Sequence, residues 1–241
     1  MNTDVLIGNA LPAVLVNIVF GLVAYRVGGV RGSGLLGGLL VGIPIFLFLG
    51  WPGFVVLAVM FVLGTALTRM GYVRKQRMGV AEEKKGARGA SHALANAGIA
   101  ALCAFLAWAT TNPLWALAYA AALATSAMDT AGSEIGPLWG RRTISLRNLR
   151  PVPPGTEGAV SLEGTLAGMA AALVLAVTGA GLGLYSFSGT ITVVVAATLG
   201  NLYEGIVGSR GLLPHTWLNA TNTLVGALAA AGIATVLRLP I

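Results

Sequence analysis

One stretch of the chain gathers side chains that can bind a metal ion, in the order Asp129-Thr-Ala-Gly-Ser-Glu-Ile-Gly136. Asp129 directly follows an apolar run, and an ionisable group at such a depth is costly unless it is paired or binds something. On a helix Asp129 and Glu134 lie about 140° apart, so both carboxylates reach one ion only if Gly132 breaks the helix. Carboxylates combined with substrate phosphates are the usual ligands of Mg²⁺. The stretch therefore predicts a Mg²⁺ site with Asp129 and Glu134 as its first ligands and catalytic groups.

Side chains suited to phosphate follow this stretch. Three arginines carry planar guanidinium groups that match phosphate oxygens: Arg141, Arg142 and Arg147. A segment rich in glycine and hydroxyl groups then leads into an apolar run, and the N–H groups at a helix N-terminus attract phosphate. Its candidate phosphate-binding residues are Gly155, Thr156, Gly158, Ser161, Gly164 and Thr165. These parts suffice for phosphoryl transfer, in which catalysis depends chiefly on positioning and charge neutralisation.

Further polar residues interrupt apolar runs elsewhere in the chain. Glu204 lies in a largely apolar run, and we expect it to face the interior of a helix bundle. It is either a third catalytic and metal-binding carboxylate, beside Asp129 and Glu134, or a structural partner of Arg210. The remaining candidate contacts to substrate or nucleotide phosphates are Lys75, Asn96, Asn201 and Asn222.

Each of these groups also has a purely structural interpretation. The arginines could set membrane topology or bind lipid headgroups. Asp129 and Glu134 could form salt bridges with them and bind no ligand. The charged residues between 69 and 92 could form a solvated loop or attract anionic lipid. The chain has neither a Gly-x-x-x-x-Gly-Lys-Ser/Thr loop nor a Gly-x-Gly-x-x-Gly turn, so we expect any nucleotide to bind at helix ends.

Membrane helices must position these side chains. Hydrophobic residues make up 56% of the 241 residues and charged residues 10%, with a mean hydropathy of +0.83. Apolar runs that can cross a hydrocarbon core of about 30 Å recur along the whole chain. We predict an all-α, polytopic transmembrane bundle of about eight spans: Leu6–Tyr25, Ser33–Gly50, Pro52–Leu67, Leu94–Thr110, Pro113–Met128, Leu162–Leu182, Thr190–Val207 and Leu218–Leu237.

Eight spans determine which loops share a side, and the basic residues test that count. Fourteen of the fifteen lysines and arginines, Lys84 and Lys85 among them, fall in odd-numbered loops, and only Arg238 lies opposite. By the positive-inside rule these loops are cytoplasmic and both termini are outside. We therefore expect one integral membrane domain over residues 1–241 in the cell membrane, with cytoplasmic loops at about 69–92 and 129–161 and a cytoplasmic active site. The net charge of +7 then reflects topology, and no nucleic acid partner is expected.

The polar motifs resemble those of the transmembrane protein 19 and phytyl-phosphate kinase family. The resemblance rests on Asp129 to Gly136, on Gly155-Thr-Glu-Gly-Ala-Val-Ser161 and on Gly164-Thr165, and extends to Arg31-Gly-Ser-Gly34. It implies a kinase that transfers a phosphoryl group from a nucleoside triphosphate, CTP in the plant members, to an isoprenyl monophosphate. It also implies that Asp129 and Glu134 hold Mg²⁺, while Arg141 and the segment from Gly155 to Thr165 hold phosphates.

The resulting hypothesis is an isoprenyl-phosphate kinase that makes the diphosphate of a lipid such as phytyl or geranylgeranyl phosphate within the bilayer. Three alternatives remain open: a CTP-dependent kinase of the free prenol, a cytidylyltransferase, and a membrane transporter or flippase. A transporter predicts carboxylates spread along several spans, whereas here they concentrate at the ends of spans. A homo-oligomer is compatible with this sequence.

Overall fold

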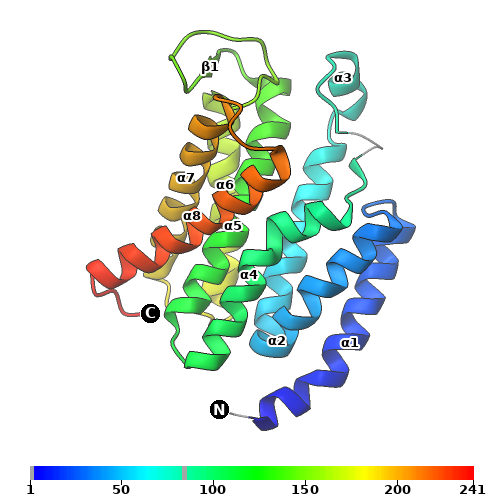
Figure 1. Ribbon diagram of the computed structural model, residues 1–241, viewed down its shortest axis with the longest axis vertical. Helices are drawn as coiled ribbons and strands as arrows, with labels where there is room; N and C mark the ends of the chain where they lie inside the picture. The colour runs from blue at the N-terminus through cyan, green and yellow to red at the C-terminus, as the bar shows by residue number, and fades with distance from the viewer. Residues whose placement is uncertain (1–2, 83–85) are drawn as a thin grey trace.

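The computed structural model describes residues 3–82 and 86–241, and these residues form a bundle of helices (Figure 1). Lys84 and Lys85, which contribute to the predicted topology, lie outside the described residues. The elements are α1 (Thr3–Arg26), α2 (Gly32–Arg69), α3 (Tyr72–Arg77), α4 (Ala90–Thr110), α5 (Leu114–Trp139), β1 (Thr143–Ser145), β2 (Ala159–Ser161), α6 (Leu162–Gly181), α7 (Gly189–Gly208) and α8 (His215–Val236).

Helix α2 folds back on itself at Gly50, the one residue inside it with non-helical backbone angles (φ 62°, ψ −152°). Only glycine adopts such a positive φ without strain, and Pro52 follows immediately. Figure 1 shows the first arm of α2 running away from the α1 loop and the second arm returning to α3. The turn predicted between two spans at this position is therefore confirmed.

Among the described residues, five helices are long and apolar enough to cross a membrane: α1, α2, α4, α6 and α7. Because α2 bends at Gly50, each of its arms is about 27 Å long and can cross by itself. Leucine, isoleucine and valine side chains remain exposed on the outer helices, as in Leu11 of α1 and Ile191 of α7. The chain is thus a multi-pass bundle, while the count of eight spans and the outside position of both termini stay predictions.

Helix α5 is the central helix of the bundle. From Leu117 to Ala124 every residue is fully buried, and α5 packs against α2, α4, α6, α7 and α8. Most of these buried residues are alanines, and small side chains let helix backbones approach closely within a bilayer. A long helix surrounded on all sides in this way can hold polar groups in its C-terminal part in fixed positions.

The helix α5 continues through Gly132 to Trp139, so the expected loop from residue 129 begins only after residue 139. Gly132 is not a helix breaker, because it lies where α5 crosses α6. A Cβ atom on Gly164 would lie 2.9 Å from the carbonyl oxygen of Gly132, and one on Gly168 would lie equally close to that of Met128. The glycines therefore allow two helices to meet at backbone distance.

A small antiparallel sheet departs from the all-α prediction. Strands β1 and β2 pair with Thr143 opposite Ser161, and they close the segment between α5 and α6. The second strand runs directly into α6, where Ser161 is the N-cap and its hydroxyl accepts a hydrogen bond of 3.1 Å from the Gly164 N–H. The hairpin and α3 lie at the same end of the bundle, opposite the start of α1 (Figure 1).

Candidate functional site

Two cavities meet beside the C-terminal part of α5. The first has a volume of about 260 Å³ and lies between α5, the start of α4 and the start of α8. The second, of about 470 Å³, lies between α5, α7 and the segment that precedes α6. Both cavities are lined by the same group of side chains: Glu82, Asp129, Ser133, Glu134 and His215. A wall rich in carboxylates therefore separates two chambers that lie side by side.

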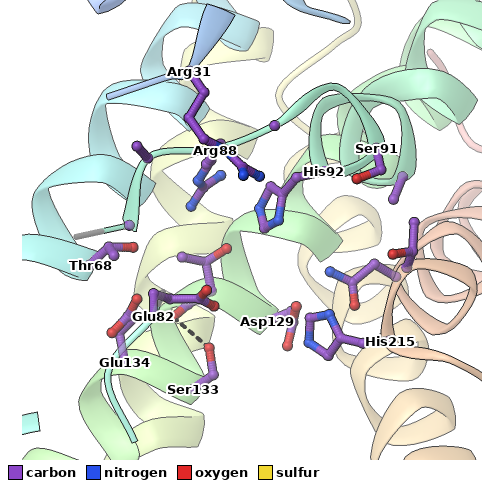
Figure 2. A pocket seen from close by; sticks show the side chains of 17 residues that line it. Arg31, Thr68, Glu82, Arg88, Ser91, His92, Asp129, Ser133, Glu134 and His215 are labelled. Carbon is purple, nitrogen blue, oxygen red and sulfur yellow. Dashed lines mark hydrogen bonds between the residues drawn. The ribbon is translucent and has the colours of Figure 1, made fainter. Parts of the chain in front are cut away.

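Basic side chains line the far side of the first cavity. Arg31 and Arg88 come from two different loops, which pair through their backbones: the Arg31 N–H donates to the Arg88 carbonyl at 3.0 Å, and the Arg88 N–H to that of Gly29 at 3.1 Å. Figure 2 shows these two side chains with His92 on one side of the cavity, facing Asp129 and His215 on the other. We call this chamber the arginine cavity.

The arginine cavity encloses Arg88 closely. Burial lowers the pKa of its guanidinium below the ordinary value of an arginine. The carboxylates of Glu82, Glu134 and Asp129 oppose that shift, since each favours the charged guanidinium. Among the described residues neither Arg31 nor Arg88 forms a salt bridge. Arg88 is largely enclosed and Arg31 is exposed, and the two cations line one cavity in which a phosphate group can bind.

Glycines and hydroxyl groups line the second cavity, which we call the glycine cavity. Gly155 and Gly158 have positive φ angles of 84° and 69°, which favour glycine. A Cβ atom on Gly158 would also clash with the backbone of Ser209 at the end of α7. The chamber thus holds backbone groups near the N-terminus of α6, where an anion is favoured. Its predicted members are Gly155, Thr156, Gly158, Ser161, Gly164, Thr165, Asn201 and Glu204.

Asp129 and Glu204 approach each other across the glycine cavity, within hydrogen-bonding reach. Asn222 of α8 donates a hydrogen bond to Glu204. Two carboxylates this close repel each other unless a cation or a proton lies between them. The side-chain oxygens of Asn219 and Asn222 are buried and have no hydrogen-bond partner among the described residues. Facing carboxylates with nearby amide oxygens match the hard oxygen ligands of Mg²⁺, which keeps several waters and takes the rest from substrate.

Glu134 faces another direction, and its neighbour is Lys75. The Lys75 ammonium group forms a buried salt bridge with Glu134 and also donates to the carbonyls of Thr68 at 2.8 Å and Leu67 at 3.1 Å. Since α5 is continuous at Gly132, Glu134 and Asp129 point from different faces of the helix. Within residues 3–82 and 86–241, no three acidic, histidine or cysteine side chains converge as metal ligands. The structure thus joins Asp129 to Glu204 and leaves Glu134 with Lys75.

The predicted phosphate-binding arginines lie elsewhere. Arg141, Arg142 and Arg147 are exposed around the hairpin and line neither cavity. This placement suits the alternative interpretation, in which they meet lipid headgroups or solvent. Asn96 lies inside the bundle, where it donates to the carbonyl of His92 and accepts from Ser126, both at 2.8 Å.

Sequence reasoning did not select Arg31, Arg88, His92 and His215 as site residues. One sequence feature could have indicated the two arginines. Both are followed closely by glycine, in Arg31-Gly-Ser-Gly34 and in Arg88-Gly89. A Cβ atom on Gly89 would lie 2.6 Å from the guanidinium of Arg31, and one on Gly64 would lie 2.8 Å from that of Arg88. These glycines leave room for the guanidinium groups, a relation that is visible only once the loops are placed.

Comparisons with known proteins agree with this architecture. The family model described as "Integral membrane protein DUF92" matches residues 15–211. "Uncharacterized membrane protein sll0875" of Synechocystis is 43% identical over 80% of this chain and 78% of its own length. "Protein VTE6, chloroplastic" of Arabidopsis thaliana is 35% identical over 84% of this chain and 64% of its own length. "Uncharacterized membrane protein MJ0933" of Methanocaldococcus jannaschii is 29% identical over 90% of both chains.

No solved structure matches the chain. The family match covers most of the sequence and includes α5, which lines both cavities, and the glycine segment and Glu204, which line the glycine cavity. The resemblance to the transmembrane protein 19 and phytyl-phosphate kinase family is thereby confirmed. This chain belongs to the integral membrane protein DUF92 family.

Proposed function

We propose that the protein is an isoprenyl-phosphate kinase that transfers a phosphoryl group from a nucleoside triphosphate, with CTP as the first candidate, to an isoprenyl monophosphate. One observation carries the proposal: two phosphate-suited cavities meet at the wall formed by Asp129, Ser133 and Glu134. A kinase must bring two anionic phosphates together, and this requires cationic and N–H groups on both sides of the reacting atoms.

The reaction divides between the two cavities. An oxygen of the acceptor monophosphate attacks the γ-phosphorus of the nucleotide, and the bond between that phosphorus and the β–γ bridging oxygen breaks. The nucleoside diphosphate leaves with the electron pair, and the lipid becomes a diphosphate. Mg²⁺ held by Asp129 and Glu204 would neutralise the phosphate oxygens, with Glu134 close by. Arg31 and Arg88, which line the arginine cavity, would offset the repulsion between the acceptor phosphate and the nucleotide phosphates.

The cations in the arginine cavity favour a phosphate acceptor over the free alcohol. A prenol would need a base to remove its proton and would leave Arg31 and Arg88 without an anion. A phosphate monoester is already anionic at neutral pH, so its oxygen can attack without a base, and it pairs with both guanidinium groups. The membrane location of the family also suits an acceptor whose apolar chain dissolves in the bilayer.

A transfer assay on the purified protein in detergent tests the proposal. It uses Mg²⁺ with CTP or ATP labelled on the γ-phosphate, and phytyl, geranylgeranyl or farnesyl monophosphate, with the matching alcohols in parallel. Labelled isoprenyl diphosphate together with unlabelled nucleoside diphosphate is the expected result. Product from the alcohols alone would favour a prenol kinase, and release of pyrophosphate a cytidylyltransferase. Absence of any product from folded protein would overturn a transferase and favour transport.

A further inference from the structure

A third cavity extends from the arginine cavity into the apolar part of the bundle. It is a narrow crevice of about 80 Å³ between α1, both arms of α2 and the start of α4. Its lining is almost entirely apolar, with Phe20, Leu39 and Met60 among the larger side chains. Three residues, Arg88, Gly89 and His92, line both this crevice and the arginine cavity. The apolar crevice therefore begins at Arg88 and His92, while Arg31 lines the arginine cavity alone.

A cationic chamber that continues into an apolar crevice matches a phosphate monoester with one apolar chain. We propose, building on the function above, that the isoprenyl monophosphate binds with its phosphate at Arg31 and Arg88 and the adjoining part of its chain in the apolar crevice. The nucleotide phosphates then occupy the glycine cavity. The acceptor and donor thus approach the carboxylate wall of Asp129 and Glu134 from opposite sides.

The position of the crevice explains how a membrane lipid reaches the site. Helix α1 lies at the edge of the bundle (Figure 1) and packs chiefly against α2. Many of its apolar side chains are exposed. An isoprenyl chain that enters the crevice between α1 and α2 stays in contact with the bilayer. The crevice is too small for a whole phytyl or geranylgeranyl chain, so the distal part remains in lipid. This arrangement predicts that the site selects lipids with a single apolar chain attached to the phosphate. It also predicts that the total length of that chain has little effect on binding.

Gly38 offers a direct way to fill the crevice. It lines the crevice from the first arm of α2, and a Cβ atom there would meet no other atom within 4 Å. Gly38→Leu therefore adds bulk to the crevice lining at a position where the Cβ atom itself fits. Gly98→Leu in α4 is the matched control, because a Cβ atom on Gly98 also meets nothing within 4 Å and Gly98 lines none of the three cavities.

The experiment measures equilibrium binding of radiolabelled geranylgeranyl monophosphate and of geranylgeraniol to purified protein, without nucleotide. We expect Gly38→Leu to weaken binding of both ligands by about tenfold, and Gly98→Leu to leave both unchanged. Arg88→Gln should weaken binding of the monophosphate and not of the alcohol, since the alcohol has no charge for the guanidinium to meet.

Three outcomes would overturn part of the scheme, and they are distinguishable. Failure of the unaltered protein to bind the monophosphate would contradict the kinase itself. Tight binding that is insensitive to Gly38→Leu would contradict only the crevice as the chain site. Displacement by dioleoyl phosphatidic acid as strong as that by unlabelled geranylgeranyl monophosphate would show a general site for lipid phosphates and overturn the isoprenyl assignment.

Discussion

Asp129 and Glu134 lie on one helix, yet their neighbours give them different chemistry. Asp129 faces Glu204, which Asn222 holds in place by a hydrogen bond. Glu134 is paired with Lys75, whose ammonium group is also fixed by two backbone carbonyls. We therefore propose Asp129 and Glu204, rather than Glu134, as the ligands of Mg²⁺. Glu134 and Lys75 are better described as a brace that fixes the loop end of α2 against α5.

Asp129→Asn should lower the rate of phosphoryl transfer by about 100-fold or more, because a neutral amide cannot neutralise Mg²⁺ beside Glu204. Steady-state kinetics over a range of Mg²⁺ concentrations measures this effect. Glu163→Gln is the control, since Glu163 is a half-buried acid in the first turn of α6 that lines neither cavity. An equal loss in both variants would argue against a specific role for Asp129.

Lys75→Met should reduce the free energy of unfolding by about 3–5 kcal/mol, because it leaves the buried carboxylate of Glu134 without its partner. The double variant Lys75→Met with Glu134→Leu should recover most of that loss, since no buried charge remains unpaired. Thermal unfolding in detergent, followed by circular dichroism, gives the comparison. A double variant no more stable than Lys75→Met alone would contradict the brace.

The crossing of α5 and α6 sets the distance between the carboxylates and the glycine segment. Gly132 on α5 and Gly164 on α6 bring the two backbones together, and Ser161 caps α6 just beyond this contact. Movement of α6 would displace Ser161, Gly164 and Thr165, which line the glycine cavity. The glycines selected as phosphate ligands therefore act in part through helix packing.

Gly164→Ala should destabilise the protein by about 1–3 kcal/mol, because its Cβ would lie 2.9 Å from the Gly132 carbonyl oxygen and would force the helices apart. Gly181→Ala in the same helix is the control, since a Cβ there meets nothing within 4 Å and alanine favours a helix. The measurement is the unfolding temperature of each variant, which should fall for Gly164→Ala and not for Gly181→Ala. Equal temperatures would show that α6 can move away from α5 without cost.

The bundle as a whole gathers its polar segments at one end. The pairing of the loops at Arg31 and Arg88, helix α3, the hairpin and the start of α8 all lie around the two cavities, at the end of the molecule that carries α3 and β1 in Figure 1. This arrangement agrees with the concentration of basic residues in alternate loops. In the proposed reaction, the charged chemistry then lies at the aqueous interface and the acceptor chain in the lipid.

Single cysteines in a Cys103→Ala background test which side of the membrane the cavities face. Cys103 is buried, so its replacement by another small residue removes background labelling with little disturbance. Asn148→Cys beside the hairpin should react with a membrane-impermeant maleimide in inverted vesicles, and Asn112→Cys between α4 and α5 in right-side-out vesicles. The opposite pattern would place the cavities outside the cell.

Hydropathy and the positions of Gly and Pro by themselves predicted the apolar helices and the turn at Gly50, and they selected Asp129, Glu204 and the glycine segment as candidate site residues. These features follow from local composition, because a bilayer admits few backbone structures and a buried charge demands a partner. Helix geometry also predicted that Asp129 and Glu134 point apart on a continuous helix.

Tertiary structure decided which polar groups meet. Lys75 and Glu134 pair across distant parts of the chain, Arg31 and Arg88 meet through paired loops, and the arginines after α5 turn away from the site. Sequence could not reveal these relations, because long charged side chains have many possible partners and loop pairing selects among them. Continuity of α5 through Gly132 was decided in the same way, since the close contact with α6 stabilises a helix that glycine alone would weaken.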